Sequence, residues 1–440
     1  IRGRLDFLTP EFVAGMCASF GNYVGGGRVL VGRDTRTSGG MVQGAAVSGL
    51  LSVGCSVADL GVVPAPTVEF ETTRLRASGA VAVTASHNPP EWNALKFVDK
   101  DGIAISKERG EGIEKIFEQG SKRAQWSEIR GIENYSLALR DHISAIKNYV
   151  DGARIKKEKL KLVLDCGNGT ASLLAPYLFR ELGCGVLSLN AQPDGFFPGR
   201  DPEPTMGNVR DLIACVVETE ADAGIAWDGD GDRVIFVDEK GCYVIGDKVF
   251  ALCADSALAR KKGDVVTTVA TSDVVRDIAK KHGSRVVYTK VGGPYISEKM
   301  REMRAVVGGE EVGGVIWPDV HLGKDGFITA AKIVEAMARS GEPLSKLVAR
   351  LPAYFNAKTK IPCAGEKKLK IMRAITEKAR KEGREVVTLD GARINYPDGW
   401  CIARPSGTED YIRIFAEAKS CGRAEGLVEE WSRFAKREIG

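Results

Sequence analysis

Strands and helices are predicted to alternate in the same order three times along this chain, and this repetition restricts the fold more than any other feature. The first repeat has strand 28–32, helix 40–54, strand 55–60, a helix near 68–75 and a strand leading into residue 86. The second has strand 159–169, helix 171–183, strand 184–190, a helix near 209–218 and strand 221–227. The third has strand 264–272, helix 273–283, strand 284–290, helix 294–303 and strand 305–311. Such alternation indicates mostly parallel sheets covered by helices on both faces.

The C-terminal part of the chain follows another pattern. From about residue 360, short strands and turns precede a final amphipathic helix, which predicts a small α+β domain. The predicted fold class is therefore α/β, with three similar mixed α/β domains of mostly parallel sheets plus a C-terminal α+β domain. A length of 440 residues suits three or four domains of about 150 residues each. We place their bounds at 1–148, 149–249, 250–358 and 359–440.

Composition argues against several classes of function. Lys and Arg number 62 against 58 Asp and Glu, and no basic run is interleaved with aromatic residues, so nucleic-acid binding is not expected. The most apolar window, 44–66, is interrupted by Asp59, serines and prolines before the roughly 18 apolar residues of a membrane span, so no membrane partner is expected. Ten cysteines without a Cys-x-x-Cys pair indicate reduced thiols in a cytoplasmic protein. Because the chain opens on Ile1 without an apolar leader, we expect no signal peptide and a few missing residues before it.

Each repeat ends in a loop whose side chains could take part in catalysis or ligand binding. Ligands of open α/β sheets gather at the carboxyl ends of the strands, so these loops are expected to face one site. The loops are Ser86-His87-Asn88, the stretch Asp-Gly-Asp-Gly-Asp-Arg at 228–233, and Gly-Gly-Glu-Glu-Val-Gly-Gly at 308–314.

The second loop predicts a metal site. Asp228, Asp230 and Asp232 are spaced by two, so in an extended backbone their side chains project to one side. Three converging carboxylates call for a cation, and an all-oxygen site suits Mg²⁺ or a similar hard ion. The alternatives are an acidic surface turn, or an EF-hand with Glu239 at its twelfth position. The EF-hand is rejected because Arg233 stands at its sixth position, where glycine is required, and because 234–239 is predicted as a strand.

Ser86 has no acid nearby to complete a catalytic triad, although His87 and Lys96 are close in sequence. A cation beside it would remove the need for a triad. If Ser86 carries a phosphoryl group, an oxygen of that group can be a further metal ligand, and the ion neutralises charge during transfer.

Four motifs in order carry a family resemblance: Thr-Ala-Ser-His-Asn-Pro at 84–89, 228–233, 308–314, and Arg-Pro-Ser-Gly-Thr-Glu at 404–409. In order and spacing they resemble the motifs of the α-D-phosphohexomutases, which include phosphoglucomutase, phosphomannomutase and phosphoglucosamine mutase. The resemblance covers essentially the whole chain. It implies four domains arranged around a central cleft, one motif from each, and interconversion of hexose 1-phosphates and 6-phosphates through an enzyme phosphoserine and a hexose 1,6-bisphosphate.

The resemblance also implies roles for individual residues. Ser86 is the phosphoserine, and Ser86, Asp228, Asp230 and Asp232 hold one Mg²⁺ per chain. The remaining catalytic residues are Lys96 as a general acid or base, His87 near it, and Arg233 beside the phosphoserine. Substrate binding falls to Glu310 for sugar hydroxyls, to Arg404, Ser406, Gly407 and Thr408 for the non-reacting phosphate, and to the cleft residues Arg2, Arg33 and Lys290.

Two positions depart from the family pattern. Many relatives read Gly-Glu-x-Ser-Gly-His where this chain has Gly309 to Gly314, so a serine and a histidine that touch the sugar there are absent. Together with the stretch 321–326, this motif is closer to archaeal-type members, whose sugar preferences are mixed. The preferred hexose therefore stays open between glucose, mannose and glucosamine, and both a monomer and a homo-oligomer are compatible with the sequence.

Physical arguments support the roles of single residues. Arg404 offers bidentate recognition of a phosphate, and an ammonium such as that of Lys96 loses proton affinity near a metal and other cations. His142, His282 and His321 have no partners at metal-ligand spacing and are interpreted as structural or surface residues.

Two other functions remain open from the residues alone. A metal-dependent sugar phosphatase would also use three aspartates, but it has no use for a distal phosphate clamp. A non-enzymatic sugar- or nucleotide-binding regulator is suggested by the glycine-rich turn 165–172, which lacks the Gly-x-Gly-x-x-Gly pattern and a P-loop lysine.

Overall fold

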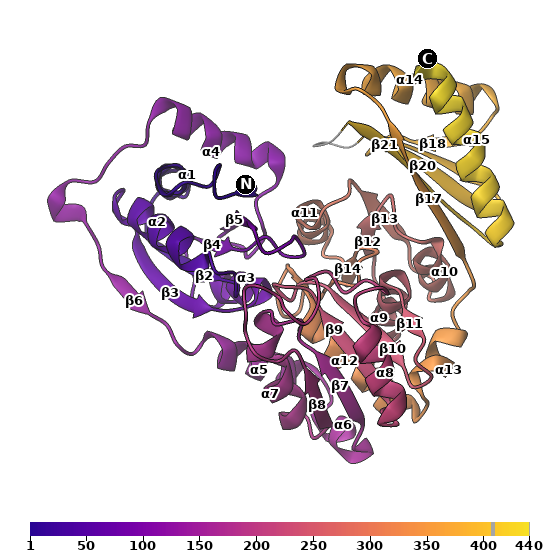
Figure 1. Cartoon of the computed structure of the whole chain (residues 1–440), viewed down its shortest axis with the longest axis horizontal. Coiled ribbons are helices and arrows are strands. Elements are labelled where there is room, and N and C mark those ends of the chain that lie inside the picture. Colours follow the sequence, from indigo (N-terminus) through magenta and orange to yellow (C-terminus); the bar gives the residue numbers. More distant parts are fainter. Residues whose placement is uncertain (406–409, 440) are drawn as a thin grey trace.

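The computed structural model describes residues 1–405 and 410–439, and within them it contains four β-sheets that follow one another along the chain (Figure 1). The first three sheets mix parallel and antiparallel strands, and the fourth is antiparallel, which confirms the predicted fold class. In the described part of the chain, no helix combines the length and the apolar character needed to cross a membrane.

The first sheet has the strand order β1-β5-β4-β2-β3-β6. Its strands are β1 (Arg2–Arg4), β2 (Arg28–Arg33), β3 (Ser56–Val62), β4 (Gly79–Val83), β5 (Trp92–Asp99) and β6 (Ile132–Asn134). The helices of this region are α1 (Pro10–Tyr23), α2 (Gly39–Leu51), α3 (Ala65–Arg74), α4 (Lys107–Gln119) and the short 3₁₀ turn η1 (Trp126–Glu128). Strand β5, which the repeat did not predict, pairs antiparallel with β4 and closes a hairpin around the Ser86 loop.

The second sheet has the order β11-β10-β9-β7-β8. Its strands are β7 (Lys161–Asp165), β8 (Gly185–Leu189), β9 (Ala223–Trp227), β10 (Val234–Asp238) and β11 (Tyr243–Val244). Its helices are α5 (Ala138–Tyr149), α6 (Gly152–Glu158), the 3₁₀ turn η2 (Thr170–Leu173), α7 (Ala175–Glu181) and α8 (Arg210–Glu218). The three aspartates lie between β9 and β10, and the strand at β10 confirms that this segment is not an EF-hand.

The third sheet has the order β13-β12-β14-β15-β16. Its strands are β12 (Val265–Thr268), β13 (Val286–Thr289), β14 (Val307–Gly309), β15 (Val315–Ile316) and β16 (Lys324–Asp325). Its helices are α9 (Gly246–Arg260), α10 (Asp273–Lys281), α11 (Gly293–Met303), α12 (Gly326–Ser340) and α13 (Leu344–Ala349). The glutamate motif connects β14 to β15, and β16 returns antiparallel beside it.

The fourth sheet has the order β17-β21-β20-β19-β18 and carries two helices. Its elements are β17 (Phe355–Pro362), α14 (Gly365–Lys381), β18 (Glu385–Val387), β19 (Ala392–Tyr396), β20 (Gly399–Pro405), β21 (Tyr411–Ala418) and α15 (Cys421–Ile439). Its larger apolar core is its own, and Trp400 and Ile402 of β20 also pack against Val269, which follows β12 of the third sheet.

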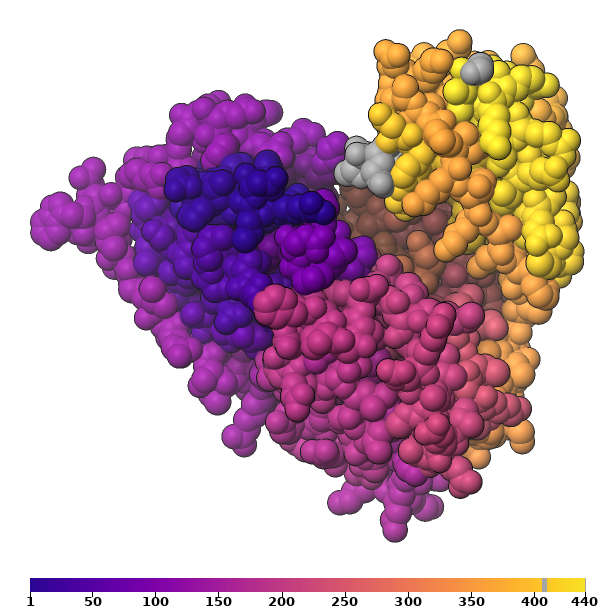
Figure 2. All heavy atoms as spheres, in the orientation of Figure 1, coloured from indigo at the N-terminus to yellow at the C-terminus, as the bar shows by residue number. Residues whose placement is uncertain are grey.

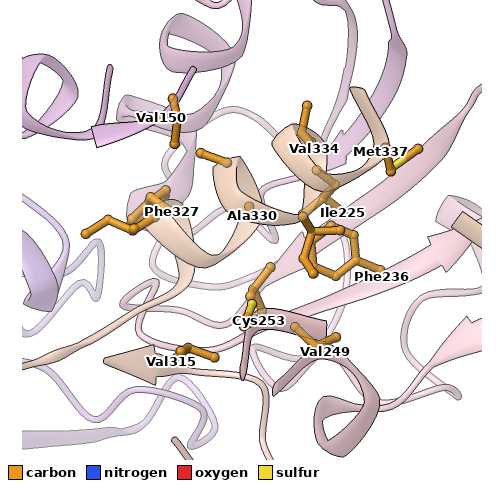
Figure 3. Packing of buried hydrophobic residues seen from close by; sticks show 14 of the residues in the cluster. Val150, Ile225, Phe236, Val249, Cys253, Val315, Phe327, Ala330, Val334 and Met337 are labelled. Carbon is orange, nitrogen blue, oxygen red and sulfur yellow. The ribbon is translucent and has the colours of Figure 1, made fainter. Parts of the chain in front are cut away.

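One apolar core joins the second and third sheets. Helix α12 lies across it, and Phe327 at its start stacks on Trp227 of β9 with ring centroids 5.7 Å apart. Figure 3 shows Ile225 and Phe236 of the second sheet close to Val334 and Met337 of α12. This shared core fixes the aspartate loop and the glutamate loop relative to each other. The predicted domain bounds at 148/149, 249/250 and 358/359 stay a prediction.

Candidate active site

Ser86 lies in the turn that follows β4, in a backbone conformation that is unusual for serine. Its φ is +52°, and its N–H donates to Thr84 Oγ1 at 2.9 Å. The side chain is buried, and Oγ donates to Asp228 Oδ2 at 2.7 Å. His87 Nδ1 is 3.3 Å from the same Oγ. The first and second motifs therefore meet in hydrogen-bond contact.

Asp228, Asp230 and Asp232 converge as the sequence predicts, with one carboxylate oxygen of each within 4.8 Å of the others. Gly231, with a φ of +78°, allows the loop to turn back between β9 and β10. Burial and the two neighbouring carboxylates raise the pKa of Asp230 well above its usual range. Asp230 Oδ1 and Asp232 Oδ1 are buried and have no hydrogen-bond partner among the described residues. An oxygen-only donor set with orphaned oxygens and excess negative charge fits a hard divalent cation such as Mg²⁺.

Lys96 on β5 faces this cluster from the first sheet. Its Nζ lies 2.8 Å from Glu69 Oε1 and 3.7 Å from Asp232 Oδ2. Burial by itself lowers the pKa of Lys96, but the carboxylates of Glu69 and Asp232 outweigh it and raise that pKa. The sequence argument expected reduced proton affinity and did not include Glu69. Among these side chains, Lys96 is a charged proton donor.

A chain of alternating charges continues into the third sheet. Lys324 Nζ lies 3.6 Å from Asp232 Oδ2 and 3.0 Å from Glu310 Oε2. The order Glu69, Lys96, Asp232, Lys324, Glu310 therefore links elements of three sheets. Sequence reasoning missed Glu69 and Lys324, since neither belongs to a motif loop.

Arg233 and His87 complete the surroundings of Ser86. Arg233 donates to Glu203 Oε1 at 3.0 Å, and Asp228 and Asp232 raise its pKa against the effect of burial. Burial, followed by the charges of Arg233 and Arg2, lowers the pKa of His87 to about 3. His87 is therefore a neutral imidazole near pH 7.

The remaining predicted cleft residues fall into two groups. Arg2 lines the cleft and donates to Asn88 Oδ1 at 2.6 Å. Arg33 instead points to Gln43 Oε1 at 3.0 Å, at the start of α2. Lys290 is half exposed and pairs with Glu108 of α4 at 2.9 Å. The structure brings Arg2 to Ser86 but does not bring Arg33 or Lys290 to it.

Arg404 is the penultimate residue of β20 and donates to Asp390 Oδ2 at 2.7 Å. The same oxygen accepts the N–H of Val291 at 3.0 Å, which ties the fourth sheet to the loop after β13. The predicted clamp residues Ser406, Gly407 and Thr408 lie outside the described residues.

These groups surround a cleft of about 470 Å³. Figure 2 shows the surface hollowed between the indigo and purple N-terminal part and the orange and yellow C-terminal part, but none of the described residues from β17 onward lines the cleft of 470 Å³. The lining combines the three sheets and includes Arg2, Ser86, Lys96, Asp232, Arg233 and Lys324. The cleft is thus strongly charged and suited to a small anionic ligand that reaches Ser86.

Arg36, another residue that the sequence did not single out, holds the Ser86 turn from below. It is fully buried and donates to the carbonyl oxygens of Ser86, Asn88, Pro89 and Trp92 at 2.9, 2.6, 2.5 and 3.0 Å. Its Nε donates to Asp34 Oδ2 at 3.0 Å. In the sequence, only its position two residues beyond Asp34, in the loop after β2, could have pointed to this role.

His142 and His321, interpreted from the sequence as structural or surface residues without partners at metal-ligand spacing, are buried and both contact one carboxylate. Their Nε2 atoms lie 2.8 and 3.0 Å from Asp325 Oδ2, and all three side chains are buried. The N–H of Gly323 donates to His321 Nδ1 at 3.0 Å, so the proton of that neutral ring is on Nε2. Thr67 Oγ1 forms a hydrogen bond of 2.9 Å with His142 Nδ1. Since both Nε2 atoms donate to Asp325, the three side chains form a hydrogen-bonded junction.

Comparison with known proteins matches four consecutive parts of the chain to one family. Family models named "Phosphoglucomutase/phosphomannomutase" match residues 1–124 (alpha/beta/alpha domain I), 140–241 (domain II), 245–355 (domain III) and 359–433 (C-terminal domain). The "Phosphoglucomutase/phosphomannomutase" of Thermococcus kodakarensis is 45% identical over 96% of this chain and 94% of its own length. The "Probable phosphoglucosamine mutase" of Methanopyrus kandleri is 41% identical over 99% and 96%.

Solved structures agree with this assignment. A phosphoglucomutase/phosphomannomutase family protein from Burkholderia thailandensis has a TM-score of 0.87 at 31% identity, covering 100% of this chain and 97% of that chain. The N-acetylphosphoglucosamine mutase of Aspergillus fumigatus, solved with GlcNAc-6P and magnesium, shares the fold with a TM-score of 0.60 at 17% identity, covering 86% and 93%. The chain belongs to the phosphoglucomutase/phosphomannomutase family of phosphohexomutases, which are intramolecular phosphotransferases.

Proposed function

We propose that this phosphohexomutase carries its phosphoryl group on Ser86 and exchanges it with the free hydroxyl of a hexose phosphate. The observation that carries this proposal is the 2.7 Å hydrogen bond from Ser86 Oγ to Asp228, inside a buried aspartate cluster that opens into the cleft. Moving a phosphate between O1 and O6 of a hexose spans more than one side chain can bridge. A resident phosphoryl group meets this difficulty, because it is donated to one end before the other phosphate is taken back.

The metal assignment rests on the same cluster. Asp228, Asp230 and Asp232 would hold one Mg²⁺, with a phosphoryl oxygen of phosphorylated Ser86 as a further ligand. When bound, the ion supplies neutralisation of the charge on the phosphoryl group as it is transferred. The magnesium in the A. fumigatus relative supports this choice of ion.

Side chains around Ser86 account for the movement of protons. Lys96 is charged and lies beside the cluster, so it is the proposed donor and acceptor of the proton at the reacting oxygens. Neutral His87, at 3.3 Å from Ser86 Oγ, orients that hydroxyl. The positive guanidinium of Arg233 balances the negative charge of Asp228 and Asp232.

At the other end, Arg404 with Ser406, Gly407 and Thr408 would clamp the phosphate that is not reacting. Glu310 would accept hydrogen bonds from sugar hydroxyls, with Arg2 at the cleft wall. Arg33 and Lys290 would reach the substrate only by leaving their contacts with Gln43 and Glu108. The bisphosphate formed in the first half of the cycle must turn over between these two ends. Hexose 1,6-bisphosphate is therefore both intermediate and activator, and the reaction fits a cytoplasmic protein with free thiols.

Replacement of Ser86 tests the proposal. Intact-mass measurement should show one phosphate on the wild type after treatment with hexose 1,6-bisphosphate and none on Ser86→Ala. Mutase turnover should fall by several orders of magnitude in the variant, with hexose-phosphate binding largely kept. Near-wild-type turnover would exclude Ser86.

The substrate is assigned by a panel of the 1- and 6-phosphates of glucose, mannose and glucosamine with Mg²⁺. Free inorganic phosphate is measured in the same reactions, since a phosphatase would release it in proportion to substrate consumed. A mutase releases almost none.

A further inference from the structure

Lys324 is a buried cation in the cleft to which the preceding roles assign nothing. It is the first residue of β16, and its side chain is 12% exposed. The ammonium lies between Asp232 of the aspartate cluster and Glu310 of the third-sheet loop. The side chain lines the same cleft as Ser86.

The surrounding backbone is built to admit this side chain. A Cβ at Gly314 would lie 3.2 Å from Lys324 Cδ, and a Cβ at Gly293 would lie 3.3 Å from Lys324 Cε. Both contacts are tighter than ordinary van der Waals packing. The absence of side chains at Gly314 and Gly293 therefore leaves the path along which the lysine stem reaches the cleft.

The charges around Lys324 leave it able to bind an anion. An ammonium has three donors, and its partners are Glu310 at 3.0 Å and, as an ion pair without hydrogen-bond distance, Asp232 at 3.6 Å. Asp232 is also one of the three converging aspartates, and a cation bound to them would neutralise part of its charge. Burying an ammonium is energetically unfavourable unless it has partners. Lys324 lines the cleft and has N–H donors that its two carboxylate partners do not use, so it is suited to bind phosphoryl oxygens.

We propose, on the basis of the function assigned to Ser86, that Lys324 binds the phosphoryl group while it moves between Ser86 and the sugar. In that step the bond from Ser86 Oγ to phosphorus breaks as the bond from phosphorus to the substrate hydroxyl oxygen forms. The hydroxyl proton leaves the substrate and one proton reaches Ser86 Oγ through the acid and base groups of the cleft. Lys324 neither gives nor takes a proton; it donates hydrogen bonds to the equatorial oxygens.

The variant Lys324→Met tests this because methionine keeps an unbranched stem over Gly314 and removes the ammonium. The wild type and the variant are phosphorylated with hexose 1,6-bisphosphate, mixed with hexose 6-phosphate, and the loss of phosphate from Ser86 is followed by intact mass. We expect transfer to slow by about tenfold to a hundredfold, as for loss of a charge-assisted hydrogen bond. Lys324→Arg should recover part of the rate. The control Lys281→Met, on the 64% exposed lysine of α10, should match the wild type.

A second readout needs no turnover and no metal. Calorimetry of inorganic phosphate binding to the unphosphorylated, metal-free protein should give about tenfold weaker binding for Lys324→Met than for Lys281→Met. Thermal unfolding of each variant checks that the fold is retained, and Lys324→Arg keeps the test valid if the methionine variant is unstable.

Two outcomes would overturn the proposal. One is unchanged transfer and unchanged phosphate binding in Lys324→Met. The other is a double variant Lys324→Met/Glu310→Gln that transfers no more slowly than Glu310→Gln alone, since Lys324 would then act only by positioning Glu310. Normal turnover in Ser86→Ala would instead refute the phosphoserine function itself, so the two failures are distinguishable.

Discussion

The guanidinium of Arg36 donates a hydrogen bond to the carbonyl oxygen of Ser86 at 2.9 Å. The Nη2 that makes this bond also donates to the carbonyl of Asn88, and Nη1 donates to those of Pro89 and Trp92, so one buried side chain sets the course of the whole turn. Asp34 balances the charge at 3.0 Å. The position of the Ser86 hydroxyl thus depends on a residue fifty positions earlier in the chain.

Arg36→Met should destabilise the protein and slow the mutase. Breaking a buried ion pair leaves Asp34 without its partner, which costs about 3–5 kcal/mol of unfolding free energy. Arg36→Lys should be intermediate, because one ammonium cannot reach the four carbonyls. Denaturant unfolding and kcat are measured together. The control is Arg28→Met, whose exposed pair with Glu133 should contribute at most about 1 kcal/mol, and equal losses in the two variants would contradict the clamp.

Asp230→Asn should stabilise the metal-free protein and abolish its response to Mg²⁺. Because the pKa of Asp230 is raised in the folded state, the folded protein binds more protons than the unfolded chain above the usual carboxyl range. The free energy of unfolding then falls as pH rises, by up to about 1.4 kcal/mol per pH unit for one proton. In Asp230→Asn this fall of the unfolding free energy with rising pH should be absent, because asparagine does not titrate.

The measurement is thermal unfolding from pH 4 to 8 with chelator and with Mg²⁺. Mg²⁺ should raise Tm in the wild type through binding to the native state, and should raise it little in the variant. If both proteins respond equally to Mg²⁺, or if activity survives exhaustive chelation, the metal assignment is wrong.

Asp325→Asn should destabilise the junction below α12. Asparagine can still cap the helix, where Asp325 Oδ1 accepts from Phe327 and Ile328, but it cannot supply one charged oxygen to both imidazoles. His142 lowers the pKa of Asp325 despite burial, so this carboxylate contributes stability above its ordinary pKa that is lost as pH falls. We expect Asp325→Asn to lower the free energy of unfolding by about 1–3 kcal/mol at pH 7, because imidazole N–H donors are left unsatisfied. The difference between the variant and the wild type should become smaller as the pH falls. Zn²⁺ should shift Tm equally in the wild type and in His321→Gln, and a shift lost in that variant would indicate a metal site.

Arg404→Ala should weaken the two directions of the reaction alike. If Arg404 holds the phosphate that is not reacting, it acts in both halves of the cycle, and a charge-assisted contact is worth about 1.5–3 kcal/mol, or tenfold to a few hundredfold in kcat/KM. Free bisphosphate should accumulate as it escapes, and Arg404→Lys should recover only part. Steady-state kinetics from each hexose phosphate decides this, and a loss in one direction only would mean that Arg404 serves a single binding mode.

The motif loops were predictable because each is a contiguous stretch at the end of a predicted strand. The spacing of Asp228, Asp230 and Asp232 brought all three together as expected. Arg36 and Lys324 could not be found in this way, since their roles depend on which strands pair and on where glycines leave room.

The histidine junction shows the same limit more clearly. His142 and Asp325 are 183 positions apart and meet only because α5 packs against the start of α12. The spacing of residues along the chain therefore could not predict that His142 contacts Asp325. The contact of Lys96 with Glu69 was missed for a related reason, since Glu69 reaches it from α3, on another element.

The left-handed backbone at Ser86 restricts which hydroxyl amino acid can serve as the phosphoryl carrier. Threonine offers the same nucleophilic oxygen, but its branched Cβ makes a φ near +52° a strained conformation. Serine lacks that branch, and asparagine and aspartate are the side chains that adopt this conformation most readily. The main chain thereby selects among phosphorylatable side chains before any reaction takes place.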